Sequence, residues 1–491
     1  MNYTKEKIRN VAIVGSAGSG KTSLVEAILF NSKITNRLGR VEDGNTVSDF
    51  HPDEVARVSS IYTSLISFDV GGTKINLLDT PGYFDFIGDS ISAVSVADSV
   101  IFVFDALSEI DATFEYLWES VDKPKAIFIN KLDKEDIDLE KTIARLVNFN
   151  SAVVPVFLPD QTGTRFSKVQ SILKQSSEEA NNYREKFVET IASCDDLLVE
   201  KYLNGKEITN DELTVSFRGG VASGRMIPIL CGSATKNIGC SEIVGFINEF
   251  LPVASVLPNT DKPAMLVFKS VIEPHTGNLS FLKIYSGKIE HGSDHKNLTR
   301  MTTERFGTLC NLLGKKRTEI SQAIAGDIVV VAKLRETHTN DIFGDEASVE
   351  KIKQINFPEP SISMAVVPKS KGEEEKVAGA LQSMMREDPT IKSSYNAETK
   401  QLILSGLGAL HIEVAIARVK ERYGVDVEFK LPRVAYRETI KNNTEVQGKY
   451  KRQTGGRGQY GDCLLKLEPM ERGKGFEFVN AIREGRIPRN Y

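Results

Sequence analysis

A glycine-rich stretch at residues 15–22 constrains the fold more than any other feature of this chain of 491 residues. It follows an apolar run at residues 11–14 and precedes a segment with helical spacing at residues 23–29. A strand, a glycine-rich turn and a helix in this order predict a P-loop, in which backbone N–H groups and a helix N-terminus hold phosphate oxygens. The loop consists of Gly15, Ser16, Ala17, Gly18, Ser19, Gly20, Lys21 and Thr22.

Two side chains of this loop have predicted roles in binding and hydrolysing a nucleoside triphosphate. Lys21 is expected to reach the β- and γ-phosphates, and the Thr22 hydroxyl is expected to ligate Mg²⁺. A chance glycine-rich turn is the alternative, and the strand and helix around the stretch argue against it.

A second motif follows the apolar run at residues 75–78. Its residues are Asp79, Thr80, Pro81, Gly82 and Tyr83. Asp79 is expected to hold the Mg²⁺ shell, and the Gly82 N–H is expected to contact a γ-phosphate, so this segment is interpreted as a nucleotide-sensing switch. An ordinary turn formed by Pro and Gly is the alternative.

Two further loops predict which base is bound. One follows the strand pattern at residues 126–129 and consists of Asn130, Lys131, Leu132 and Asp133. The Asp133 carboxylate can accept hydrogen bonds from N1–H and the exocyclic amine of guanine, which adenine does not offer at that edge. The other follows residues 227–230 and contains Ser233 and Ala234, where a backbone N–H can contact the guanine oxygen. The four motifs predict a GTPase domain that binds GTP or GDP.

The periodicity along the chain predicts a multidomain protein of the α/β and β classes. Alternating strand and helix patterns predict a parallel sheet in a first domain, residues 1–257, with an irregular insert at about residues 160–225. Short alternating strands predict a β-barrel at residues 258–353. A compact α+β domain is expected at residues 354–432, and a fourth unit at residues 433–491.

Composition predicts a cytoplasmic protein. No apolar run is long enough for a membrane span, the N-terminus lacks a signal-peptide pattern, and the scattered cysteines indicate a reducing compartment. The net charge is −4, yet basic residues outnumber acidic ones in residues 433–491. This asymmetry favours a polyanionic partner at that end, with an ordinary solvated surface as the alternative. A monomer is expected.

Several stretches in the last two units are more specific than a P-loop. They are residues 357–360 (Phe-Pro-Glu-Pro), 386–389 (Arg-Glu-Asp-Pro), 406–413 (Gly-Leu-Gly-Ala-Leu-His-Ile-Glu), 434–439, 452–461 and 476–480. With them the whole chain resembles the elongation factor G family of translational GTPases. The run at residues 39–49 is most similar to the divergent "elongation factor G-like" branch.

The resemblance implies a P-loop GTPase domain with an insert, a translation-factor β-barrel, a ferredoxin-like third domain and a partial, ribosomal-protein-like fourth domain. It implies GTP, GDP and Mg²⁺ as ligands. It also implies the ribosome, with its RNA and proteins, as the partner, which would account for the basic end.

Three departures from the family pattern bear on activity. Tyr83 stands where the family usually has a water-orienting His, so hydrolysis is expected to slow without weaker GTP binding. The family's spacing from Asp79 places the Mg²⁺-binding hydroxyl of the first switch at Ser60, with Thr63 as a rival. Family members also continue beyond Tyr491, and we expect a truncated fourth domain whose apolar strand, at residues 463–467, lacks its cover.

Three functions fit these residues. The first is ribosome-associated GTP hydrolysis coupled to a translocation-like change, in which Lys21, Gly82 and Tyr83 act on the γ-phosphate and the attacking water. The second is a GTP-dependent ribosome-binding switch with little or no hydrolysis. The third is a ribosome-protection GTPase of the tetracycline-resistance type.

Overall fold

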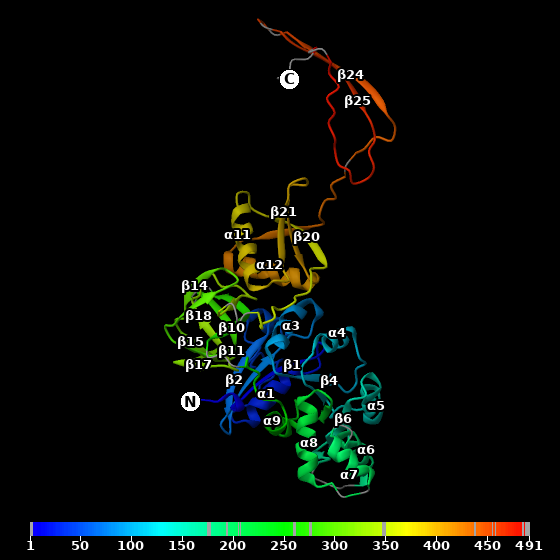
Figure 1. The fold of residues 1–491 in the computed structure, drawn as a ribbon, viewed down its shortest axis with the longest axis vertical. Helices are drawn as coiled ribbons and strands as arrows, with labels where there is room; N and C mark the ends of the chain where they lie inside the picture. Colours follow the sequence, from blue (N-terminus) through cyan, green and yellow to red (C-terminus); the bar gives the residue numbers. More distant parts are fainter. Residues whose placement is uncertain are drawn as a thin grey trace. The chain divides into compact units, whose positions relative to one another are not determined.

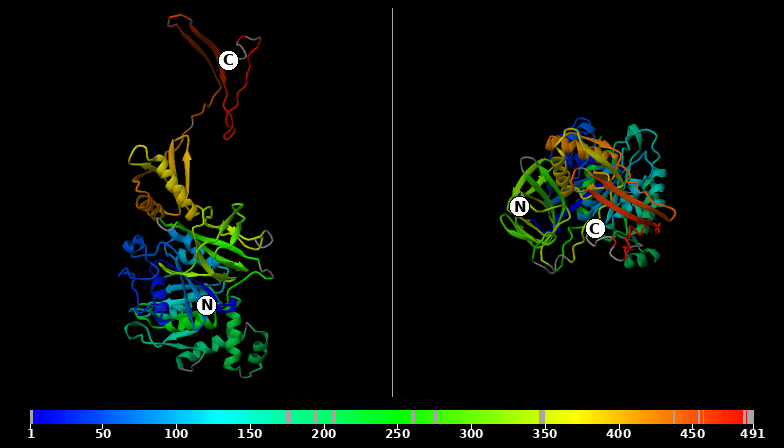
Figure 2. Two further views of the ribbon diagram at one scale, coloured as in Figure 1. Left: turned by 90° about the vertical axis from the view of Figure 1, so that its left-hand side faces the viewer. Right: turned by 90° about the horizontal axis from the view of Figure 1, so that it is seen from above.

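The computed structural model describes residues 3–173, 178–192, 195–204, 206, 208–258, 262–273, 277–345, 350–436, 438–453, 455–456, 458–483 and 486. Figure 1 and Figure 2 show the chain coloured from its N-terminus in blue to its C-terminus in red. It forms two compact units, which are described separately: Met1–Asn396 with Lys400–Pro432, and Ala397–Thr399 with Arg433–Tyr491. Among the described helices, none has both the length and the apolar character needed to cross a bilayer.

A mostly parallel sheet forms the centre of the first domain, as the alternating patterns predicted. Its strand order is β2-β3-β1-β4-β5-β9-β6, and every neighbouring pair is parallel except β2 with β3. The strands are β1 (Ile8–Val14), β2 (Ser64–Val70), β3 (Thr73–Asp79), β4 (Ser99–Asp105), β5 (Lys125–Asn130), β6 (Val153–Pro155) and β9 (Ile227–Cys231). Parallel strands of this kind are buried on both faces, and all seven residues of β1 are buried.

Helices cover both faces of this sheet. They are α1 (Lys21–Asn31), α3 (Ile87–Val96), α4 (Ala112–Ser120), α5 (Leu139–Phe149) and α9 (Cys240–Glu249), and a short α2 (Pro52–Arg57) precedes β2. Alternate residues of β1 point to opposite faces. Val11 and Ile13 therefore pack with α1 and α9 in one core, and Ala12 and Val14 pack with α3, α4 and α5 in another. The carboxyl ends of the strands meet at the edge where the predicted loops lie.

The insert is helical rather than irregular. Its elements are β7 (Phe157–Pro159), β8 (Val169–Ser171), α6 (Glu178–Ala192), α7 (Asp196–Leu203) and α8 (Asn210–Ala222). Leu213, Phe217 and Val221 repeat every fourth residue on α8 and are buried in the core that α1 and α9 share. The many polar residues between such apolar positions hid this helical stripe from the sequence prediction.

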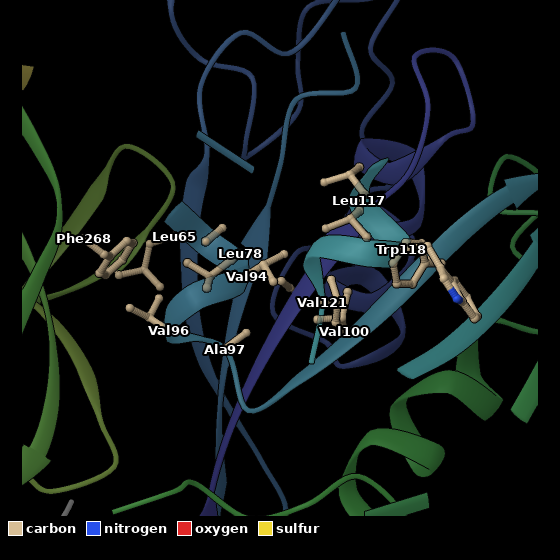
Figure 3. Close-up of a cluster of buried hydrophobic side chains, with 14 of the residues drawn as sticks. Leu65, Leu78, Val94, Val96, Ala97, Val100, Leu117, Trp118, Val121 and Phe268 are labelled. Atoms are coloured by element: carbon tan, nitrogen blue, oxygen red, sulfur yellow. The ribbon is translucent and has the colours of Figure 1, made fainter. Parts of the chain in front are cut away.

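Antiparallel strands form the second domain, a small barrel. They are β10 (Ala264–Glu273), β11 (Gly277–Ser286), β12 (Lys288–Glu290), β13 (Asp294–Asn297), β14 (Thr302–Arg305), β15 (Leu309–Leu313), β16 (Lys316–Ile320), β17 (Gln322–Ile324), β18 (Ile328–Ala332) and β19 (Ile342–Phe343). Strand β10 serves two cores: Met265 and Val267 lie in the barrel core, whereas Leu266 and Phe268 lie in the first domain's core. Figure 3 shows Phe268 beside Leu65 and Val96.

The third domain has the β-α-β-β-α-β order of a ferredoxin-like fold. Its elements are β20 (Ile362–Pro368), α11 (Glu374–Glu387), β21 (Lys392–Asn396), β22 (Gln401–Gly406), α12 (Ala409–Tyr423) and β23 (Val427–Lys430). The antiparallel sheet has the order β21-β22-β20-β23. Val377, Leu381 and Met384 on α11 fill its core. The predicted combination of an α/β domain, a barrel and a ferredoxin-like domain is thus confirmed.

The second unit contains one β-hairpin, β24 (Thr444–Arg452) with β25 (Gln459–Leu467). Alternation along β25 separates Leu464 from Leu465 and Leu467, and all three are exposed by 42–68%. Arg437, Thr454 and Arg457, which belong to the family-like stretches, lie outside the described residues.

Candidate nucleotide site

The glycine-rich loop joins β1 to α1 in a conformation that requires its glycines. Gly20 is the N-cap of α1 and has φ +95°, in the left-handed region that favours glycine. A Cβ atom on Gly20 would lie 2.3 Å from the Asn130 amide nitrogen. This loop therefore brings its backbone N–H groups to the start of α1, where the helix dipole favours an anion.

Lys21 is the first residue of α1, and its side chain is buried. Its ammonium group donates hydrogen bonds to the carbonyl oxygens of Gly15 and Ser16, at 2.9 and 3.0 Å. Burial lowers the pKa of Lys21 to about 8, against the opposing effect of the Asp79 carboxylate. A phosphate oxygen in contact with this ammonium would favour its charged form, because an opposite charge raises the pKa of a lysine.

Three loops that are distant in sequence are joined at the predicted base site. The Asn130 amide donates to the Ser19 carbonyl at 2.8 Å, and its oxygen accepts from the Ala234 N–H at 2.9 Å. The Ser233 hydroxyl donates to the Asp133 carboxylate at 2.6 Å. Asp133 is half-buried rather than fully buried, which leaves its carboxylate accessible to a base edge.

Lys131 and Leu132 complete this loop. Leu132 is buried in the hydrophobic core, and Lys131, with φ +67°, directs its ammonium group to Asp105 at the end of β4, 2.7 Å away. Asp105 was not a predicted site residue, although its place at the end of a parallel strand is a signal that sequence reasoning could have used.

The Asp79 motif lies directly against the glycine-rich loop. The Thr22 hydroxyl donates to the Asp79 carboxylate at 2.9 Å. Thr80 donates to the Ile13 carbonyl, and the Pro81 carbonyl accepts from Ser90. Gly82 lies so close to the loop that an added Cβ atom would be 2.4 Å from the Lys21 ammonium nitrogen and 2.7 Å from the Ala17 nitrogen.

Ser60, rather than Thr63, is the first-switch hydroxyl that lies beside Thr22. The two hydroxyl oxygens of Ser60 and Thr22 are 3.0 Å apart. Thr63 instead donates to the backbone carbonyl of Asp89 at 3.0 Å. The spacing from Asp79 thus led to the residue that the structure brings to this cluster.

Asp49 joins this cluster and was missed by sequence reasoning. Burial and the neighbouring Asp79 carboxylate raise the pKa of Asp49 to about 7, and burial raises that of Asp79. One oxygen of each carboxylate is buried with no hydrogen-bond partner in the described part of the chain. Two carboxylates with two hydroxyls are oxygen donors of the kind that Mg²⁺ requires, so the residues present fit this ion.

Tyr83 follows Gly82 in an extended conformation, and its side chain is 44% exposed. The next residue, Phe84, packs edge-on against Tyr116 of α4, with ring centroids 5.3 Å apart. His51, the nearest histidine before Tyr83 in the sequence, packs against Phe50 and Tyr62, and burial lowers its pKa to about 4.

Asp111 is a second residue that sequence reasoning missed. Its carboxylate accepts from the Ser16 hydroxyl at 2.7 Å and from the Phe114 N–H at 2.8 Å, so it fixes the glycine-rich loop to the start of α4. An acidic residue ahead of a helical pattern signals an N-cap, but its contact with Ser16 follows only from the fold.

Family models match almost the whole chain. They are "Elongation factor Tu GTP binding domain" at residues 6–253, "Elongation factor G domain 2" at residues 262–346, "Elongation Factor G, domain III" at residues 357–431 and "Elongation factor G, domain IV" at residues 432–491.

Similar proteins agree with these models. "Elongation factor G" of Thermotoga petrophila is 34% identical over 531 residues, covering 99% of this chain and 76% of that protein. The Thermotoga maritima protein of the same name is 34% identical, with 99% and 77% covered. A crystal structure of a Thermus thermophilus protein matches with a TM-score of 0.86 and 31% identity, covering 95% of this chain and 74% of that one. With its GTPase domain and the three domains that follow, the chain belongs to the elongation factor G family of translational GTPases.

Proposed function

We propose that this translation factor binds GTP and Mg²⁺ at the edge of its first domain and hydrolyses GTP when it associates with the ribosome. The observation that carries this proposal is the convergence of separate loops on one site. Asn130 bonds to Ser19 and Ala234, and Thr22 bonds to Asp79 beside Ser60. We further propose domain boundaries near residues 257, 353 and 432, and a monomeric protein.

Guanine recognition is assigned to Asp133. Its carboxylate would accept from both N–H groups at the Watson–Crick edge of guanine, while Ser233 holds it in place through a 2.6 Å hydrogen bond. Lys131 would lie along the base, with its ammonium group fixed by Asp105. A site built to pair with a specific N–H edge rejects bases that lack it, because its own buried polar groups are then left unpaired.

The Mg²⁺ ligands in this proposal are the hydroxyls of Thr22 and Ser60, with Asp79 acting through water. Asp49 is added as a second carboxylate that could hold such a water, because burial and then the Asp79 carboxylate raise its pKa, and a nearby cation would favour its charged form. When bound, the ion would neutralise the negative charge that develops on the phosphate oxygens.

Lys21 and the Gly82 N–H would stabilise the γ-phosphoryl group during hydrolysis. Tyr83 is the residue available to orient the attacking water, and a phenol is a poor base at neutral pH. Because phosphoryl transfer depends mainly on positioning and charge neutralisation, an exposed Tyr83 fits a site that its partner completes. The basic segment at residues 433–491 supports a partner rich in RNA phosphate.

A GTP-dependent switch with little hydrolysis is the second candidate. The specific observation in its favour is the exposed Tyr83 at the position where the family usually has His. In this candidate the same loops bind GTP, and binding alone changes the affinity for the ribosome.

GTP hydrolysis with and without ribosomes distinguishes the two candidates. Strong stimulation by ribosomes, lost in Lys21→Ala, is the expected result for a working GTPase. GTP binding without stimulation would favour the switch, and equal affinity for ATP and GTP would contradict the assignment of Asp133.

A further inference from the structure

Glu26 is a buried carboxylate of α1 for which the proposed nucleotide site has no use. The residue is only 1% exposed. Burial raises the pKa of Glu26, and the Asp79 carboxylate raises it further, whereas the N–H groups of Val47 and Gly39 lower it. A buried carboxylate is costly unless it is hydrogen-bonded. The backbone of the segment at residues 39–47 therefore stabilises Glu26, and Glu26 in turn holds that segment.

Both ends of this segment meet the Glu26 carboxylate. The Val47 N–H donates to Oε1 of Glu26 at 2.6 Å. The other oxygen, Oε2, lies against Gly39, where a Cβ atom would be only 2.2 Å away. Between these ends the chain forms a loop, in which the Arg40 N–H donates to the Asn45 side chain at 2.8 Å. One side chain of α1 thus closes the loop that leads into the first switch.

The barrel holds Val47 from its other side. Gly314 lies in the turn between β15 and β16 and has φ +56°. A Cβ atom on Gly314 would be 1.9 Å from the Val47 carbonyl oxygen, so this close approach requires glycine. The Gly314 N–H donates to the Leu65 carbonyl of β2 at 3.3 Å, which fixes the turn itself. Glu26 at the N–H and Gly314 at the carbonyl together set the position of Val47.

Asp49 follows Val47 by two residues and is placed by it. The Asp49 N–H donates to the Thr46 hydroxyl at 3.3 Å, and the Ser48 carbonyl accepts from Ser64 at 2.6 Å. These bonds leave Asp49 close enough to Asp79 for the second carboxylate to raise the pKa of the first. Like charges repel, so the backbone must hold Asp49 there. The contacts at Val47 supply that restraint.

We propose that Glu26 is a positioning residue for Mg²⁺, which holds Val47 so that Asp49 stays beside Asp79 and can accept a water of the ion. This inference rests on the proposed function, since it requires Mg²⁺ to bind with a guanine nucleotide. Glu26 acts through the reach of its carboxylate to the Val47 N–H. Groups that orient the ligands of a metal typically contribute about 10–100-fold to its affinity.

The test is the Mg²⁺ concentration that half-maximally slows release of a fluorescent GDP analogue from the 491-residue protein, which we call the Mg²⁺ requirement. Glu26→Asp keeps the charge but shortens the side chain by one methylene group, and should raise the Mg²⁺ requirement at least about tenfold. Glu26→Gln keeps the length and an acceptor oxygen but removes the charge. Because a neutral acceptor forms a weaker bond, its requirement should rise, but by less than about threefold.

Hydrogen exchange at the Val47 amide gives a second readout. The Mg²⁺ requirement should rise where this amide loses its protection. Gly314→Ala displaces Val47 from the side of the barrel and should raise the requirement with Glu26 intact. Affinity for GDP in the presence of a chelator should equal that of the parent in Glu26→Asp and Glu26→Gln, whereas a general loss of structure would lower it.

Two further variants serve as controls. Asp49→Ala should raise the Mg²⁺ requirement, and adding Glu26→Asp to it should give no further increase, because Glu26 acts through Asp49. Leu146→Ala removes a buried side chain of α5 from the other core of the same domain. It should lower the free energy of unfolding and leave the Mg²⁺ requirement unchanged.

An unchanged Mg²⁺ requirement in Glu26→Asp would overturn the proposal. A larger rise in Glu26→Gln than in Glu26→Asp would do so too, because it would assign the effect to charge, as would a raised requirement in Glu26→Asp with the Val47 amide still protected. If Glu26→Asp does not fold, as judged by circular dichroism, Gly314→Ala decides. A parent protein whose GDP release ignores Mg²⁺ would contradict the proposed function and this inference together, so the two failures are distinguishable.

Discussion

The first domain meets its two neighbours through contacts of opposite character. Against the barrel, Lys283 of β11 pairs with Asp98 at 2.9 Å and Lys74 of β3 pairs with Asp327 at 2.8 Å, with all four side chains at most 6% exposed. We call these four residues the barrel contact. Against the third domain, Asp85 accepts hydrogen bonds from the Leu410 and His411 N–H groups, and Phe86 and the Tyr62 ring pack against α12; we call this the switch contact.

The supporting elements explain the difference between the two contacts. In the barrel contact, Lys74 and Lys283 lie on strands of one continuous sheet, and Asp98 and Asp327 directly precede strands of the same sheet. Asn10 donates a hydrogen bond to Asp98, and Asn76 donates one to Asp327. The switch contact is built from a 3₁₀ turn and loops that border the nucleotide site. Removing one partner of a buried ion pair strongly destabilises a protein, whereas the free energy of opening a loop contact is low. We therefore expect the first domain to stay fixed to the barrel, and its contact with the third domain to open more readily.

Breaking the barrel contact should have the largest effect. Lys283→Met leaves the Asp98 carboxylate buried without its cation, and should lower the free energy of unfolding by about 3–5 kcal/mol. Urea denaturation measures this loss. The control is Lys288→Met, which removes an exposed pair with Glu290 and should change stability by about 0–1 kcal/mol. Equal effects of the two variants would contradict the fixed character of the barrel contact.

Tyr62 tests the switch contact directly. The Arg418 guanidinium lies 3.9 Å from the Tyr62 ring centroid and the Lys269 ammonium 5.6 Å from it. Tyr62→Leu removes both cation–π contacts and should destabilise the docking of α12 by about 2 kcal/mol. Hydrogen exchange at the Leu410 and His411 amides measures this loss. Tyr62→Phe keeps the ring face and should lose less than half as much; a larger loss would assign the effect to the hydroxyl that contacts Asp53.

Nucleotide should change one contact and leave the other unchanged. With a non-hydrolysable GTP analogue in place of GDP, exchange of the Leu410 and His411 amides should slow about tenfold, which corresponds to ~1.4 kcal/mol of coupling, because the proposed ligands Ser60 and Gly82 adjoin the segments of the switch contact. The amides of β18 beside the barrel contact should keep their rates. A changed exchange rate in β18 as well would show that both contacts respond, and the comparison between them would fail.

The two contacts should respond to pH in opposite directions. Burial raises the pKa of Glu54 from its ordinary value of 4.5 to about 8, and its carboxylate accepts from the Ile61 and Tyr62 amides. The folded first switch therefore binds a proton that the unfolded segment releases, so its stability falls as pH rises from about 5 to 8. Protection of those two amides should decrease by about two orders of magnitude or more over this range.

Asp98 shows the opposite behaviour. Burial alone would raise its pKa, but Lys283 and the hydrogen bonds from Ser255 and Asn10 hold it below the ordinary value of 3.8. The barrel contact therefore keeps its stability at neutral pH and loses it in acid.

Glu54→Gln is the control for the first switch. The glutamine side chain cannot ionise, so protection of the Ile61 and Tyr62 amides should no longer depend on pH.

Short-range patterns predicted most of the fold and the loops of the nucleotide site. A strand, a glycine turn and a helix are contiguous in the chain, so residues 15–22 reveal their geometry without any knowledge of the fold. The family's spacing from Asp79 pointed to Ser60, with Thr63 as a rival, and Ser60 lies 3.0 Å from Thr22. Residues next to one another in sequence carry this information themselves, whereas the interval to Ser60 came from the resemblance to the family.

Contacts between distant segments could not be predicted in the same way. Asp85 and Leu410 are separated by 325 residues, and nothing in either sequence indicates the other. Asp49 and Asp111 reach the glycine-rich loop only because their own segments fold over it. The helical insert was missed for a different reason: its buried stripe on α8 is narrow, and polar residues between its members weaken the helical pattern.

The double role of β10 bears on how the protein is made. Leu266 and Phe268 complete the core of the first domain, although they lie beyond its last helix, α9, in the sequence. During synthesis, which proceeds from the N-terminus, that core stays exposed until β10 has emerged and paired with β11. We therefore expect the first domain and the barrel to fold together, and a chimaera that exchanges either alone should inherit a cavity at Phe268.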